Sequence, residues 1–341
     1  MSQFLRKCDA SVMGDAAAVL LAGGLVAFPT ETVYGLGADA CNADAVARIY
    51  SVKARPADHP LIVHVASLDG LGDWVSDVPS YAISLGRDFW PGPMTLVLRR
   101  SALAGDFITG GQDTVGVRVP NHPIALGMLV AFTKGGGKGV AAPSANRFGN
   151  VSPTTAQAVA AELGDYLADI DQILDGGACD VGVESTIIDC TGDAPKILRP
   201  GAITIQMIEE CTDLKVIGVV ETPEIRVSGS LGSHYSPVAT VALDQSPLAG
   251  QGFIAMADIA SGDEVIRLAA PETHDEFARV LYSALRAADE QGLVTVVVTQ
   301  PKGDGIAIAI RDRLRRATHK ISTDEVKEKI GFTRETIESP E

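Results

Sequence analysis

Residues 42–65 read NADAVARIYSVKARPADHPLIVHV, and this stretch combines three signals. Its first half, residues 42–52, has the apolar spacing of a helix, and Leu61-Ile62-Val63 has the composition of a buried strand. Between them stand two cations, Lys53 and Arg55, in a chain whose formal net charge is -15. An ammonium and a guanidinium this close can bind one phosphate or carboxylate, each charged hydrogen bond contributing roughly 1.5 to 3 kcal/mol. We therefore expect this turn to face an anion.

Short β-branched runs alternate with helical stretches from the N-terminus to about residue 210. Runs that predict strands lie at residues 24–28, 61–65, 94–98, 115–119, 139–142 and 186–188. Amphipathic stretches separate several of them, such as residues 154–163, which open with the capping box Thr154-x-x-Gln157. This alternation predicts an α/β domain around a mostly buried, mixed sheet.

A second domain is expected because 341 residues exceed what one hydrophobic core usually organises. Regular patterning stops between residues 221 and 237, where Ser228-Gly229-Ser230 is typical of an irregular connector. Strand patterns return at residues 238–243, 253–257, 265–268 and 293–298. Capping boxes predict two helices, one from Thr273-x-x-Glu276 to Gln291 and one starting at Ser322-x-x-Glu325. We predict an α/β domain over residues 1–215, a linker over 216–237 and a smaller α/β domain over 238–341.

The composition argues against several classes of protein. Lys and Arg number 28 against 43 Asp and Glu, so the surface should repel a phosphate backbone. The 5 cysteines are scattered without CxxC spacing, which fits reduced thiols in the cytosol. The apolar stretch 16–28 resembles a secretory signal, but Gly23-Gly24 divides it and no small-x-small cleavage site follows. We expect a soluble, cytoplasmic protein with no membrane partner.

Two glycine-rich segments invite a nucleotide-loop interpretation. Residues 35–40 match GxGxxA, with Asp58 roughly 20 residues further on, but other residues separate these glycines from the preceding strand. We favour glycines that shape a turn. Residues 134–139 fail the Walker spacing, because Phe132 stands at the first glycine position, and we expect a surface loop. The chain has no GxSxG or HExxH motif, which argues against a serine hydrolase or a zinc enzyme.

Polar residues recur at the ends of the predicted strands. They are Thr30-Glu31-Thr32, Lys53 and Arg55, Arg118, Ser144-Ala145-Asn146, Glu184-Ser185-Thr186 and Arg199-Pro200-Gly201. Taken singly, each has an ordinary explanation, such as a surface ion pair or a helix cap. Because loops at strand ends of an open α/β sheet meet in one crevice, they are expected to line one pocket. Four cations there would suit a ligand with several anionic groups, such as a nucleoside triphosphate beside a carboxylate.

Seven ordered blocks resemble the Sua5/YrdC/YciO family in its two-domain Sua5 form. They are FPTETVYGLG at 28–37, KARP at 53–56 with PLIVH at 60–64, FWPGPMTL at 89–96, VRVPNHP at 117–123, APSAN at 142–146, ESTIID at 184–189 and LRPG at 198–201. They include the family's KxR…SxN pattern. The resemblance implies a YrdC-like twisted, mixed, open sheet with helices, and a smaller Rossmann-like α/β C-terminal domain of the Sua5 type.

The resemblance also implies an activity. Family members of this form condense L-threonine, bicarbonate or CO2 and ATP into L-threonylcarbamoyladenylate and pyrophosphate, with Mg²⁺ bound to the ATP. The product is then passed to a tRNA threonylcarbamoyl transferase complex that makes t6A at position 37, so tRNA binding is expected to be weak or indirect. Two alternatives are a double-stranded RNA or tRNA-binding module and carbamoyl transfer as in hydrogenase maturation.

The motifs imply roles for particular residues. At the catalytic centre they are Lys53, Arg55, Ser144 and Asn146. Around threonine they are Thr32, His64, Arg118, Ala142 and Ser185. Around ATP they are Lys53, Arg55, His59, Thr114, Ser144, Ser152, Arg199 and Tyr235, with His59 standing where many relatives carry asparagine. The motifs imply no direct protein ligand for the metal. The family linker folds over the active site, which assigns Tyr235 of the HYSP segment to a lid.

Overall fold

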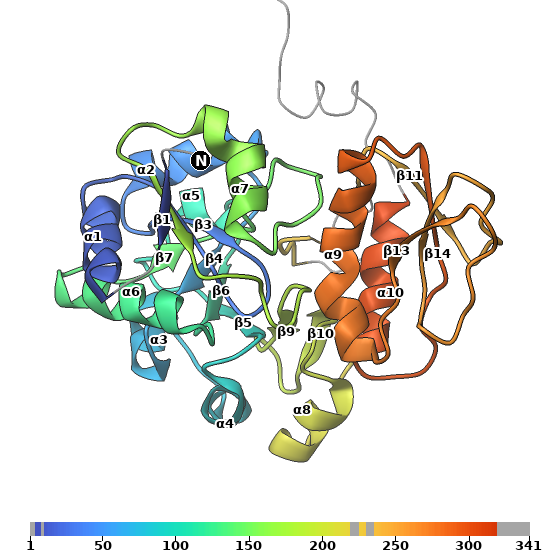
Figure 1. The fold of residues 1–341 in the computed structure, drawn as a ribbon. Helices are drawn as coiled ribbons and strands as arrows, with labels where there is room; N and C mark the ends of the chain where they lie inside the picture. The colour runs from blue at the N-terminus through green and yellow to red at the C-terminus, as the bar shows by residue number, and fades with distance from the viewer. Residues whose placement is uncertain (1–3, 8–9, 219–224, 230–234, 319–341) are drawn as a thin grey trace, which may run out of the picture.

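The computed structural model describes residues 4–7, 10–218, 225–229 and 235–318. These residues form two sheets, one of ten strands and one of four, each with its own helices (Figure 1). The mixed α/β architecture expected from the alternating pattern is confirmed. The domain boundaries at residues 215 and 238 stay a prediction, and the helix expected from Ser322 lies outside the described residues.

The large sheet runs in the order β1-β8-β2-β3-β7-β4-β6-β5-β9-β10. Its strands are β1 (Leu5–Lys7), β8 (Gln172–Asp175), β2 (Val26–Phe28), β3 (Gly35–Asp39), β7 (Val140–Ala141), β4 (Ile62–His64), β6 (Thr114–Arg118), β5 (Met94–Arg99), β9 (Thr186–Asp189) and β10 (Lys196–Arg199). Strand β4 pairs with β6 in parallel, whereas β5 pairs with β6 antiparallel, so the sheet is mixed as predicted.

Helices and short helical turns surround this sheet. They are α1 (Ala10–Leu21), α2 (Ala43–Lys53), η1 (Leu68–Gly70), α3 (Leu71–Trp74), α4 (Ser80–Phe89), α5 (Asp106–Thr109), α6 (Pro123–Lys134), α7 (Ala156–Leu163), η2 (Gly164–Tyr166) and α8 (Ile205–Thr212). The cap of α7 is Thr155, whose side chain accepts from the Ala158 N–H, and not Thr154 as the capping box suggested.

Helix α2 determines where the basic turn lies. Asn42 caps its first turn by accepting from the Ala45 N–H. The helix ends at Lys53, and Ala54 adopts a left-handed conformation with φ 48°. The N–H of Arg55 then donates to the Tyr50 carbonyl at 2.9 Å, which closes the helix in the manner usually served by glycine.

The glycine tract at residues 35–40 is largely a strand, so both the turn and the dinucleotide-loop interpretations were wrong. Strand β3 pairs antiparallel with β2, and Gly35 and Gly37 lie against the Phe28 ring. A Cβ atom at Gly37 would come within 2.8 Å of the Phe28 ring and 2.7 Å of Val140. Glycine is required here for close packing between strands and not for a loop.

The small sheet is entirely parallel, in the order β11-β14-β12-β13. Its strands are β11 (Thr240–Leu243), β12 (Gly252–Ile254), β13 (Ile266–Ala269) and β14 (Thr295–Val298), and its helices are α9 (His274–Glu290) and α10 (Ile306–Ala317). The predicted start of α9 is confirmed, since Thr273 accepts from the Glu276 N–H. Among the described residues, no helix is long and apolar enough to cross a membrane.

Helices α9 and α10 lie on the side of the small sheet that faces the large sheet (Figure 1). Arg286 of α9 pairs with Glu162 of α7 at 2.8 Å. Gly182 packs directly on α9, where a Cβ atom would lie 2.4 Å from the Cα of Arg279. These contacts hold the small sheet and its helices, called the C-terminal unit below, against the large one.

Candidate functional site

Residues in or next to seven strands of the large sheet meet at one pocket, called the main pocket below. Its lining residues are Thr30, Thr32, Val33, Gly35, Ile62, His64, Arg118, Ala142, Pro143, Ser144, Glu184, Ser185, Arg199, Ser228 and Tyr235. The five residues expected around threonine all belong to this set. The convergence expected from strand-end positions therefore occurs in part. Two of the four expected cations, Arg118 and Arg199, line the pocket, whereas Lys53 and Arg55 do not, and the role of each residue stays a prediction.

Arg118 is held at the pocket wall by an acidic partner. Its Nη2 donates to Glu31 Oε1 at 2.7 Å and to Thr32 Oγ1 at 2.9 Å. Glu31 also accepts from the Asn121 N–H at 2.9 Å, which fixes the carboxylate. Within the described part of the chain, Arg118 Nε is buried without a hydrogen-bond partner. The guanidinium is thus oriented by one carboxylate and keeps a donor for another anion.

His64 lies beside Arg118 as a buried, neutral ring. Burial and the nearby Arg118 charge lower the pKa of His64 to about 3. Its ring meets the edge of Phe28 with centroids 5.9 Å apart. Nδ1 has no hydrogen-bond partner among the residues that the structure describes. A neutral imidazole in this position can accept a hydrogen bond from a ligand, or donate one, without adding charge.

Lys53 and Arg55 are buried behind the main pocket and are not among its lining residues. Lys53 Nζ donates to the carbonyl oxygens of Ser144 and Asn146, and burial lowers the pKa of Lys53 well below its usual value. Arg55 Nη2 donates to the Pro60 carbonyl at 3.0 Å. Lys53 and Arg55 therefore hold backbone in place in this structure, and their expected contact with an anion stays a prediction.

Arg199 lies on the opposite side of the main pocket and ties three segments together. Its Nη2 donates to Ser185 Oγ at 3.1 Å, and its Nη1 donates to the Ser228 carbonyl of the linker at 2.8 Å. Ser185 Oγ also lies 2.8 Å from Thr95 Oγ1. Tyr235 is buried with φ 63°, and its ring stacks on Tyr282 of α9 at 5.7 Å. Its burial at the pocket wall agrees with the expected position of a lid residue.

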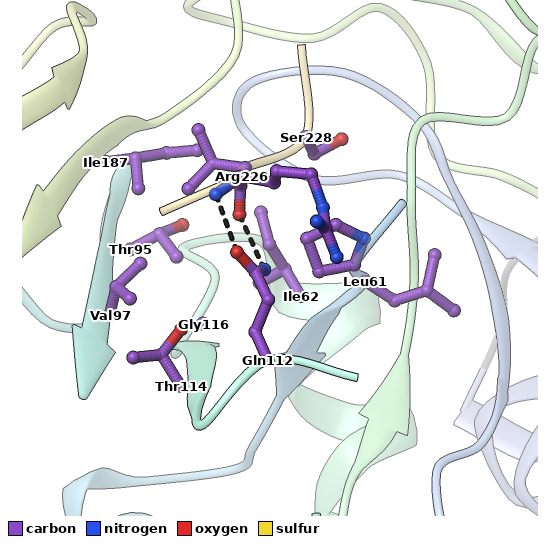
Figure 2. A pocket seen from close by; sticks show the side chains of 12 residues that line it. Leu61, Ile62, Thr95, Val97, Gln112, Thr114, Gly116, Ile187, Arg226 and Ser228 are labelled. Atoms are coloured by element: carbon purple, nitrogen blue, oxygen red, sulfur yellow. Dashed lines mark hydrogen bonds between the residues drawn. The ribbon is translucent and has the colours of Figure 1, made fainter. Parts of the chain in front are cut away.

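A second, more apolar pocket adjoins the first and is called the side pocket (Figure 2). Its lining residues are Pro60, Leu61, Ile62, Thr95, Val97, Gln112, Thr114, Gly116, Ile187, Arg226, Val227 and Ser228. It shares Ile62 and Ser228 with the main pocket. Figure 2 shows Gln112 and the linker residue Arg226 facing each other at this pocket. Thr114, expected near ATP, lines the side pocket and not the main one.

Three other expected residues lie away from both pockets. His59 is half-buried, and its ring lies edge-on to the Phe148 ring with the two centroids 5.3 Å apart. Asn146 Nδ2 donates to the carbonyls of Arg147 and Asn150, at 2.8 Å each. Ser152 is fully buried, and its hydroxyl donates to Glu184 Oε1 at 2.6 Å. Ser152 therefore supports Glu184 of the main pocket, whereas these contacts of His59 and Asn146 are to residues outside both pockets.

Glu184 was expected only as one of the strand-end residues that line the pocket, with no ligand assigned to it. It lines the main pocket and accepts from Ser152, from Tyr282 at 2.9 Å and from Arg313 at 2.8 Å. Its place in the ESTIID block was a usable signal. No sequence signal linked Arg313 or Tyr282 to the site, because both residues belong to helices of the C-terminal unit.

The mixed sheet, with cationic and hydroxyl side chains at its strand ends, defines an α/β protein that binds small anionic ligands. Two family models divide the chain. The Sua5_yciO_yrdC model, described as telomere recombination, matches residues 18–201, and the model described as threonylcarbamoyl-AMP synthase, C-terminal domain, matches residues 203–318. The chain belongs to the Sua5/YciO/YrdC family and has the two-domain form.

Relatives share this organisation over most of their length. The chain is 40% identical over 329 residues to the threonylcarbamoyl-AMP synthase of Pyrococcus abyssi, covering 89% of this chain and 93% of the relative. It is 38% identical over 327 residues to the enzyme of the same name from Bacillus subtilis, covering 89% and 92%.

Solved structures of similar proteins have the same fold as this chain. A variant of P. abyssi Sua5 superimposes with a TM-score of 0.82 at 36% identity, covering 92% of this chain and 96% of that one. A structure of P. abyssi Sua5 with L-threonine gives 0.79 at the same identity and coverage.

Proposed function

We infer that this protein joins L-threonine, bicarbonate or CO2 and ATP to form threonylcarbamoyl-AMP and pyrophosphate, a nucleotidyltransferase-type reaction. The observation that carries this inference is the meeting of Thr32, His64 and Arg118 with Ser185 and Arg199 in one pocket beside an apolar one. An amino acid and a nucleotide require these two environments side by side. The family and its similar enzymes support the same reaction.

Threonine fits the polar side of the main pocket. Arg118 keeps Nε for the amino-acid carboxylate while Glu31 holds its Nη2. Neutral His64 offers a hydrogen-bonding nitrogen without repelling the ammonium group. Ser185 and Thr32 add hydroxyl groups on either side.

We place the base of ATP at the side pocket and its phosphates at the main pocket, and both pockets have to widen to admit the nucleotide. Ile62, Val97 and Ile187 supply flat apolar walls, and Thr114 supplies a hydroxyl. Arg199 then faces the phosphate groups. Because Val227 packs in a cluster with Val97 and Ile187, the linker has to shift when the base enters.

We place the metal on the ATP. Glu31 and Glu184 are each already held by an arginine and further donors, so neither offers a spare carboxylate. Mg²⁺ bound to the phosphate oxygens would neutralise charge on the leaving pyrophosphate. The protein contributes Arg199 to the same charge. Lys53 and Arg55, the other cations expected at the phosphates, contact backbone carbonyls here.

The chemistry follows from this arrangement. The neutral threonine amine adds to CO2 and loses a proton, giving a carbamate. A carbamate oxygen then attacks the α-phosphorus of ATP as the bond to the β-phosphate oxygen breaks, and pyrophosphate leaves. Positioning and charge neutralisation supply most of the catalysis in phosphoryl transfer. Burial of Tyr235 over the pocket would keep water from the labile mixed anhydride.

The product supplies t6A formation at position 37 of tRNA and passes to a separate threonylcarbamoyl transferase complex. The formal charge of -15 argues against a strong tRNA complex of the protein itself. It therefore also disfavours the alternative of a double-stranded RNA or tRNA-binding module.

The test is direct. The protein is incubated with threonine, bicarbonate, ATP and Mg²⁺, and pyrophosphate release is followed together with the threonylcarbamoyl-AMP that mass spectrometry detects. We expect release that depends on threonine and bicarbonate. Release that is the same without threonine would overturn the proposal.

A further inference from the structure

One buried side chain of the C-terminal unit reaches the wall of the main pocket. Arg313 of α10 has no exposed side-chain area, and its Nε donates to Glu184 Oε2 at 2.8 Å. Glu184 lines the main pocket next to Ser185. An arginine from one sheet unit therefore neutralises a carboxylate in the pocket of the other.

The pair with Arg313 favours the charged form of Glu184, which is buried. Burial by itself raises the pKa of Glu184, but the charges of Arg313 and Arg199 and the Ser152 hydroxyl more than reverse that effect. Tyr282 donates to the same carboxylate at 2.9 Å, and Tyr235 lies close enough to interact with its charge. Arg313 is the closest of the cations and comes from a different unit.

Arg313 also contacts two other parts of the pocket wall. Its Nη2 donates to the carbonyl of Pro200 at 3.0 Å, next to Arg199. Its guanidinium lies 5.4 Å from the centroid of the Tyr235 ring. Asp312 accepts from Nη1 at 2.7 Å and so fixes the orientation of the group. A planar guanidinium can serve these partners together, whereas an ammonium group cannot.

We propose that Arg313 is a positioning residue for adenylate formation, which holds Glu184, the Pro200 turn and the Tyr235 ring where the ligands meet them. Through this side chain the pocket of the large sheet depends on the C-terminal unit. The proposal rests on the function inferred above. It gives the C-terminal unit a defined part in the reaction without placing any of its atoms on a substrate.

The first test compares variants of two arginines that each form an ion pair between the C-terminal unit and the large-sheet unit. Arg313→Met leaves Glu184 buried without its nearest cation, so protonation becomes easier, and activity should fall as the pH is lowered. We expect kcat/KM to fall at least about tenfold at neutral pH, with a new acidic limb between about pH 5.5 and 7.5. The control is Arg286→Met, which removes the pair with Glu162 and a hydrogen bond to the Val151 carbonyl, neither of which lines the main pocket. It should keep the pH profile of the unmodified protein.

Two further variants separate positioning from general loss of structure. Glu184→Gln combined with Arg313→Met removes the group that titrates, so the acidic limb should vanish and part of the activity should return. Arg313→Lys keeps the positive charge but cannot also reach Pro200. It should show no acidic limb and yet lose several-fold in kcat/KM, which gives a result even if Arg313→Met does not fold. Thermal unfolding of each variant monitors stability.

The outcomes are distinct. Arg313→Met with the same pH profile and activity as Arg286→Met would overturn the inference, as would an acidic limb that persists in the double variant, or Arg313→Lys with full activity. If the unmodified protein itself makes no adenylate, the proposed function fails. If it is active and the Arg313 variants behave like the control, only the role of Arg313 fails.

Discussion

Gln112 and Arg226 exchange two hydrogen bonds at the side pocket, in which the Gln112 amide pairs with the backbone of the linker. The Arg226 N–H donates to Gln112 Oε1 at 2.7 Å, and Gln112 Nε2 donates to the Arg226 carbonyl at 3.0 Å. The Gln112 side chain thus makes the two hydrogen bonds to this backbone that a neighbouring strand would make in a sheet. It holds residues 225–229 against the pocket in which we place the base of ATP.

Gln112→Ala should loosen this part of the linker. Loss of hydrogen bonds worth about 1 kcal/mol net should speed local opening roughly fivefold. Hydrogen exchange followed by mass spectrometry on a peptide that includes residues 225–229 measures the effect. Arg226→Ala is the control, because it removes the bond from Nη2 to the Gly110 carbonyl and keeps the backbone pair. Equal exchange in Gln112→Ala and the unmodified protein would contradict this role.

Ala54→Gly should stabilise the protein. Ala54 has φ 48° at the end of α2, a conformation in which a Cβ atom is unfavourable. Relief of this strain should add about 0.5 to 1 kcal/mol to the free energy of unfolding, less the entropy that glycine gains in the unfolded chain. Ala47→Gly, at an exposed position inside the same helix, should instead cost about 1 kcal/mol. Urea unfolding of both variants gives the comparison, and destabilisation by Ala54→Gly would refute it.

Sequence reasoning succeeded where local pattern and strand order decide the outcome. The cap of α9 and most strands of both sheets follow from residues close together in the chain, whereas the capping box placed the start of α7 one residue too early. The strand-end rule also anticipated that Thr32, Arg118 and Ser185 would meet in one pocket. The interpretation of the β3 glycines as turn residues was wrong, because glycines that pack on Phe28 have the same sequence pattern as turn glycines.

Partners that are distant in sequence could not be predicted in this way. Arg313 and Glu184 are 129 positions apart, and no pattern of spacing announces their contact. The same holds for Lys53, whose burial and bonds to two carbonyls depend on how the loop at Ser144 packs over α2. Charge alone indicated an anion site at the turn, whereas packing decides that this lysine braces backbone here.

Arg118→Lys should lose threonine affinity and keep ATP affinity. The guanidinium uses Nη2 for Glu31 and Thr32 and keeps Nε, whereas a lysine presents one compact ammonium group that Glu31 would occupy. We expect threonine binding to weaken about 10- to 100-fold, the loss of one or two charged hydrogen bonds. Isothermal titration with threonine and with ATP, each alone, measures the two effects. An equal loss for both ligands would show that Arg118 supports the pocket as a whole.

His64 should make the stability of the protein depend on pH below neutrality. Its pKa is about 3 in the folded protein, against an ordinary value of 6.5, so the unfolded chain binds the extra proton first. His64 therefore contributes nothing to this dependence above pH 6.5. As the pH falls from 6.5 toward 3, its burial costs stability, by up to about 1.4 kcal/mol for each pH unit.

His64→Gln keeps a polar side chain that does not titrate. Urea unfolding at pH 7, 6 and 5 should show the stability of the unmodified protein falling relative to His64→Gln as the solution becomes more acidic. Because every other titrating group is common to both proteins, a constant difference would mean that the ring is charged, or exposed, in the folded state.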